Sequence, residues 1–144
     1  MFAPSTMDVF DRRRLESAAA RLVSGPAAAA ARHLLELGIG RMIAPRRLGP
    51  IAFQLQLGGG RRAFASRLPG LGAVEFTVDA AAGAQTITWF NLESLRGGCE
   101  PLRLAEPAST RRTAVIRTGA GGVVAALCAD DSPRNSDVAF VYLH

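Results

Sequence analysis

The sequence has 144 residues, of which 49% are hydrophobic and 20% charged, a balance that is typical of a globular domain and excludes an intrinsically disordered chain. A chain of this length can bury a hydrophobic core in one domain. The formal net charge is +5, and all 17 Lys+Arg residues are arginines. Arginine in place of lysine indicates a GC-rich genome, bacterial or viral, and its guanidinium group is suited to phosphate and carboxylate partners.

Two helices are expected in the first 38 residues. Polar residues 5–6 can cap a first helix, in which Leu15 and Ala18 share one apolar face. A second, alanine-rich helix begins at Pro26, because proline fits the first helical position, and ends before Gly38, a common left-handed stop.

After residue 39 the hydrophobic period changes from that of a helix to that of a strand. The segment 100–109 contains Pro101 and Pro107, so it is expected to form a loop or an edge strand. The glycine-rich segment 119–122 is expected to be a hairpin turn. Strands are predicted over 51–57, 62–68, 74–78, 86–90, 112–118, 123–129 and 138–143.

This order of elements predicts the α+β class. We expect a single domain over 1–144, in which the helical part (1–38) packs on one face of a β-meander (39–144). The meander should form one mostly antiparallel sheet of about six to eight strands, since short connections join antiparallel neighbours.

No catalytic or metal-binding motif is present. His33 and His144 have no partner at ligand spacing, and Cys99 and Cys128 form neither a CxxC pair nor a metal pattern, so both thiols are expected to be reduced. The glycines at 119–122 precede a strand rather than a helix, which disfavours a phosphate-binding loop. We therefore expect no cofactor, no metal and no enzymatic activity, with a small basic ribonuclease as the least favoured alternative.

Arginine doublets are the candidate contacts to nucleic acid or another anion. Doublets near strand ends can meet on one rim of a sheet and bind phosphates. Codon bias explains them more simply, and nucleic-acid binding remains the alternative interpretation. The candidate residues are Arg46, Arg47, Arg61, Arg62, Arg111 and Arg112.

The last predicted strand, 138–143, is apolar on both faces. Such a strand belongs in the centre of a sheet or in an interface between copies, and Phe140 and Tyr142 are the candidate interface residues. The favoured function is a protein-interaction or self-assembly module, because weakly protected strands can pair with another chain. The alternative is nucleic-acid binding by rim arginines. The expected partner is another protein or a second copy of this chain, and no membrane association is expected. The expected location is the cytoplasm, or the interior of an infected host cell if the protein is viral.

Overall fold

The computed structural model describes residues 9–38, 46–49, 52–56, 62–78, 85–104, 106, 111–129 and 138–143. The expected cap at residues 5–6 lies outside the described residues. Helix α1 spans Val9–Arg21 and α2 spans Pro26–Glu36. As predicted, Pro26 begins the second helix and Gly38, with a positive φ of 89°, follows its end.

The strands form two sheets, which we call sheet A and sheet B, and every paired neighbour in them is antiparallel. Sheet A has the order β1-β2-β3-β4-β8-β7, with β1 Arg46–Arg47, β2 Ala52–Gln56, β3 Arg62–Leu68, β4 Ala73–Val78, β8 Arg112–Ile116 and β7 Arg103–Leu104. Sheet B has the order β10-β9-β5-β6, with β10 Val138–Leu143, β9 Val123–Ala129, β5 Gln85–Asn91 and β6 Gly97–Pro101. A short 3-10 helix, η3 Pro69–Leu71, connects β3 to β4.

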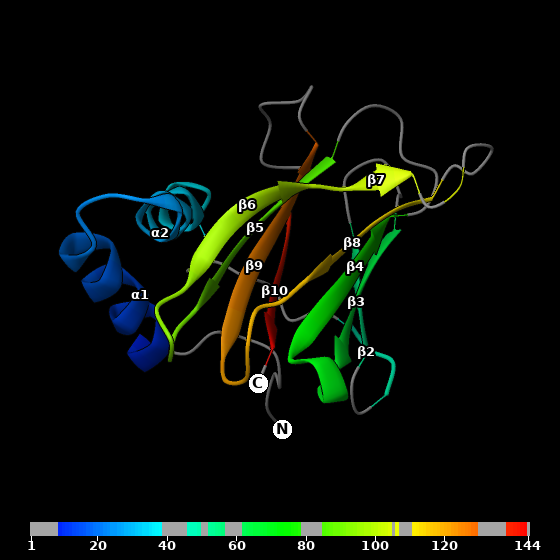
Figure 1. Cartoon of the computed structure of the whole chain (residues 1–144), viewed down its shortest axis with the longest axis horizontal. Coiled ribbons are helices and arrows are strands. Elements are labelled where there is room, and N and C mark those ends of the chain that lie inside the picture. Colours follow the sequence, from blue (N-terminus) through cyan, green and yellow to red (C-terminus); the bar gives the residue numbers. More distant parts are fainter. Residues whose placement is uncertain are drawn as a thin grey trace.

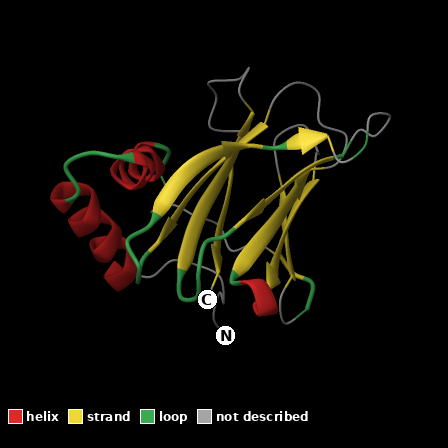
Figure 2. Ribbon diagram, in the orientation of Figure 1, coloured by secondary structure: helices red, strands yellow, loops and turns green. Residues whose placement is uncertain are grey.

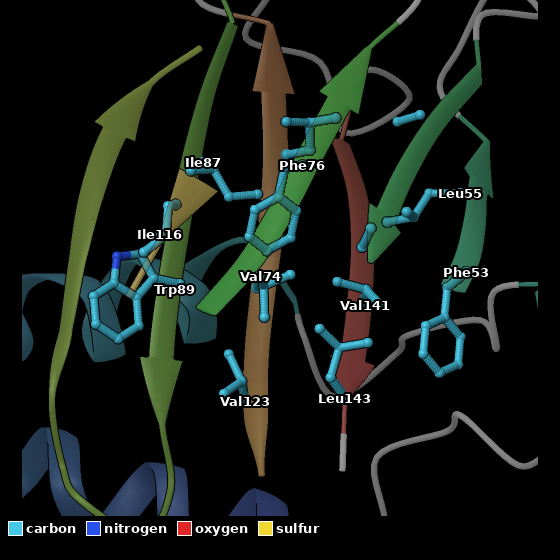
Figure 3. Close-up of a cluster of buried hydrophobic side chains, with 14 of the residues drawn as sticks. Phe53, Leu55, Val74, Phe76, Ile87, Trp89, Ile116, Val123, Val141 and Leu143 are labelled. Atoms are coloured by element: carbon cyan, nitrogen blue, oxygen red, sulfur yellow. The ribbon is translucent and has the colours of Figure 1, made fainter. Parts of the chain in front are cut away.

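The two sheets and the two helices are arranged in layers (Figures 1 and 2). The inner face of sheet A packs on sheet B through a core that includes Phe76, Ile87, Trp89 and Val141 (Figure 3). The opposite face of sheet B packs on the helices through a second cluster that includes Leu34. Sheet B is therefore the middle layer and is buried on both faces.

The predicted α+β class and the antiparallel pairing are confirmed, but the strands divide between two sheets instead of forming one. The segment 119–122 was expected to be a hairpin turn, and this prediction is wrong: it connects β8 in sheet A to β9 in sheet B. The physical reason lies in the faces of the strands. Strand β9 is apolar on both sides, so its two faces fill both hydrophobic clusters, whereas β4 offers one apolar face.

Edge placement of the proline-containing segment is confirmed, because β6, which ends at Pro101, is an edge strand of sheet B and β7 is an edge strand of sheet A.

Strand β10 lies at an edge of sheet B, so the expectation of a central position is wrong. Its two apolar faces are nevertheless covered within the chain. Val141 and Leu143 point into the core between the sheets (Figure 3), and Tyr142 and Phe140 belong to the cluster on the helix side. A strand at the edge can thus be apolar on both faces when the sheet to which it belongs is the middle layer.

Candidate functional site

One face of sheet A is turned away from the rest of the protein. Its inner face packs on sheet B, and both helices lie beyond sheet B, on the far side of the molecule (Figure 1). Among the described elements, no helix or strand packs on the opposite face, which we call the outer face of sheet A. This face is therefore the first candidate for a binding surface among the described elements.

The strand register brings polar and basic residues into one row across this sheet. Each neighbour in the row is a paired Cα partner, so the side chains of the described residues share the outer face. The row ends with an arginine on the edge strand β7. In order across the sheet it is Gln54, Phe64, Thr77, Thr113 and Arg103, and at the other edge the backbone of Arg46 is paired with that of Gln54.

Arg62 and Arg112, one residue from each of two arginine doublets, lie at the same end of sheet A. Ala63, which follows Arg62, pairs with Val78, and Val78 pairs with Arg112. One strand, β4, separates Arg62 from Arg112, which places their backbones about 10 Å apart. This distance is close to the Debye length of roughly 8–10 Å at physiological ionic strength, so charges at this end are not fully screened from one another.

The members of these doublets face different ways. Arg62 is exposed and shares the outer face with Phe64, two residues further along β3. Arg111, just before β8, is also exposed. Arg112 pairs with the buried Val78 and is half-buried, and its Nε has no hydrogen-bond partner among the described residues. The doublet therefore gives the outer surface one charge from Arg111, while Arg112 lies against the protein.

The other residues that the sequence singled out lie outside the described residues, in β1 or in the helix-side cluster. Arg61 lies outside the described residues, and so does His144. Arg46 and Arg47 form β1, where Arg47 is paired with Phe53. The proposed interface residue Tyr142 is buried in the helix-side cluster, and Phe140 is partly buried there.

Sequence reasoning missed two residues of the outer face, Arg103 and Phe64. Phe64 is half-exposed on the outer face because the fully buried Ala63 and Ala65 occupy the inner positions of β3. The alternation of small and large residues in β3 was the available signal. Arg103 had none, since it lies in a two-residue strand between prolines.

The described part of the outer face is basic and contains one exposed aliphatic residue, on β8. Among its described strand positions, Glu75 is the single carboxylate, and it pairs with Val115, which is 52% exposed. The set of described side chains can therefore contact an anionic chain through arginines and hydrogen-bond to it through Gln54 and Thr77.

Arg67 has a different, structural role. It points toward sheet B at the opposite end of β3, where its Nη2 donates to the carbonyl oxygen of Gly121 at 2.8 Å. Burial lowers the pKa of this guanidinium from its ordinary value, because desolvation disfavours the charged form. Arg67 joins β3 to the crossover between the sheets and is not part of the outer face.

Comparison with family models, with curated proteins and with solved structures gives no match for this chain. Within the described residues, no helix has the length and apolar character needed to cross a membrane. The described part of the chain also contains no group of three or more His, Cys, Asp or Glu side chains placed to hold a metal ion. The outer face of sheet A is therefore interpreted from its own chemistry.

Proposed function

We propose that the protein binds single-stranded nucleic acid on the outer face of sheet A. The observation that carries this proposal is the row across the sheet, in which a half-exposed Phe64 lies between Gln54 and Thr77 and the edge strand β7 contributes the exposed Arg103. Arginines would contact phosphates, and the ring of Phe64 would stack on a base.

The shape of the face favours a single strand over a duplex. An aromatic ring on a pleated sheet can stack only on a base that is unpaired, and the face carries no described helix that could enter a major groove. Arg62 and Arg111 at one end of the sheet extend the path for the phosphate backbone. Phosphate contacts and stacking distinguish poorly between bases, so binding should depend little on the nucleotide sequence.

Fluorescence anisotropy with a labelled oligouridine and a duplex of equal length tests this function. Replacing Arg62 and Arg103 together by alanine should weaken binding and reduce the slope of log affinity against log salt by about one per lost phosphate contact. Phe64→Leu should weaken binding by about 1–3 kcal/mol while leaving the salt slope unchanged, because it removes stacking without removing charge.

The matched control removes two charges from the other side of the molecule. Arg12 and Arg13 are exposed on α1, so their double alanine variant has the same net charge as the outer-face variant. The control should retain most of the affinity. Equal loss in both double variants would show attraction to net charge alone, and an absence of salt-sensitive binding in the wild-type protein would refute the proposal.

We propose self-assembly through the same face as a second candidate, because Val115 on β8 is an exposed β-branched residue of this face. An isologous dimer would bury it. Sedimentation equilibrium at micromolar concentration should then give a dimer mass, which Val115→Asp should reduce to that of a monomer. Val23→Asp is the control, since Val23 is 85% exposed in the connection between the helices. A monomer mass for the wild-type protein would exclude this candidate.

A further inference from the structure

Three side chains that are distant in sequence meet on the helix side of sheet B. The hydroxyl of Thr88 lies 3.4 Å from Nδ1 of His33 and 3.6 Å from Sγ of Cys99. Thr88 is 1% exposed, whereas His33 and Cys99 are both exposed. A buried hydroxyl thus links an imidazole and a thiol that are both accessible from solution.

The packing of α2 on sheet B fixes this arrangement. Cys99 and Thr88 are paired Cα partners on the neighbouring strands β6 and β5. A Cβ added at Gly97 would lie 3.3 Å from Cβ of Ala30, so the absence of a side chain at Gly97 allows α2 to approach β6 closely. His33 lies one helical turn after Ala30, and Cys99 lies two residues after Gly97 on the same face of the strand. Figure 1 shows α2 beside β6.

We infer that Cys99 is a reactive thiol, activated by His33 through Thr88, and that it forms mixed disulfides with small disulfide compounds. The Thr88 hydroxyl donates to Sγ of Cys99, and its Oγ1 lies within hydrogen-bond distance of Nδ1 of His33. Transfer of the Cys99 proton to the imidazole leaves a thiolate, which accepts from Thr88, and an imidazolium, whose Nδ1–H donates to Oγ1 of Thr88. The thiolate is the nucleophilic form of cysteine.

The reaction balances without another reactant. The Cys99 thiolate attacks one sulfur of a disulfide, the S–S bond breaks, and the leaving thiolate takes the proton held by His33. The products are a Cys99 mixed disulfide and one free thiol. Cys99 is oxidised, and the released half of the reagent is reduced.

An internal disulfide is excluded by the register. Cys128 lies on β9, which is separated from β6 by β5, and it pairs with Thr86 rather than with Thr88. Two strand spacings place the cysteines about 10 Å or more apart, whereas a disulfide requires Cα atoms within about 7 Å. The partner thiol must therefore come from another molecule.

The experiment measures the rate of mixed-disulfide formation at neutral pH with dithionitrobenzoate, whose released thiolate is coloured. Trypsin separates the two cysteines into peptides 97–103 and 118–134, so mass spectrometry assigns the modified site. Cys99 should react about tenfold faster than Cys128, and Thr88→Val and His33→Gln should each slow Cys99 by about tenfold.

Two variants separate activation from a change of structure. Thr88→Ser restores the hydroxyl and should restore the rate, while Thr86→Val, on the same face of β5, should leave the rate unchanged. His33 is exposed, so His33→Gln tests the relay even if a change at the buried Thr88 perturbs folding. Equal rates for Cys99 and Cys128, or a folded His33→Gln variant that reacts as fast as the wild-type protein, would overturn the inference.

Discussion

Asn91, at the end of β5, joins the turn that follows this strand to the crossover between the two sheets. Its side-chain amide nitrogen donates to the carbonyl oxygens of Thr118 and Ala120 at 2.8 and 2.9 Å. Its side-chain oxygen accepts from the backbone N–H groups of Glu93 and Ser94 at 2.8 and 3.0 Å. The side chain is completely buried and all four contacts are hydrogen bonds, so it stabilises two backbone segments that lack regular secondary structure.

Asn91→Asp should destabilise the protein by about 2–3 kcal/mol, because a carboxylate keeps both accepted bonds but faces two carbonyl oxygens that lose their donor. Urea denaturation followed by circular dichroism measures this difference. Gln54→Glu makes the same chemical change on the half-exposed outer face and should have little effect. Equal stability of the two variants would contradict the role assigned to Asn91.

At the scale of elements, the contact between α2 and β6 depends on one of two adjacent glycines. A Cβ at Gly97 would lie 2.7 Å from the carbonyl oxygen of Trp89 and 2.8 Å from Cδ1 of Phe90. A Cβ at Gly98 would have its nearest neighbour, Nε1 of Trp89, at 3.4 Å, an ordinary contact distance. Backbone atoms of a central strand cannot move away cheaply, so the two glycines should differ in their tolerance of a side chain.

Gly97→Ala should therefore cost about 1–3 kcal/mol of stability through overpacking. Gly98→Ala, one residue away in the same strand, should cost much less. Thermal unfolding of both variants measures the difference, and the expected result is a clearly lower melting temperature for Gly97→Ala alone. If both variants melt together with the wild-type protein, α2 does not approach β6 as closely as described.

Sites that depend on the packing of α2 on β6 could not be predicted from the sequence. Alternation in the chain indicated the strands, and Arg62 and Arg112 lie at strand ends, as the sequence predicted. The meeting of His33 with Cys99 could not be predicted, because these residues are separated by 66 positions (99 − 33) and approach through helix packing on a sheet edge. Spacing in the sequence reports only contacts within one element.

At the scale of the whole molecule, the order of the layers follows from the number of apolar faces that each element offers. Strands β9 and β10 have two apolar faces and form part of the middle layer, where one face meets sheet A and the other meets the helices. Strands β2, β3 and β4 bury one face each, so sheet A is an outer layer. Its unpacked face is where both proposed binding functions are located.

The sequence by itself determined the local structure: the two helices, most strand positions, the proline-containing edge segment and the α+β class. These features depend on periodicity, on proline and glycine, and on short-range backbone preferences. The tertiary structure alone decided which strands pair, because segment 119–122 can turn a hairpin or cross between sheets with the same residues. The tertiary structure also decided which residues share the outer face of sheet A, where Phe64 lies with Arg62 and Arg103. The reason is that the strand register is set by burial of the opposite face across the whole sheet.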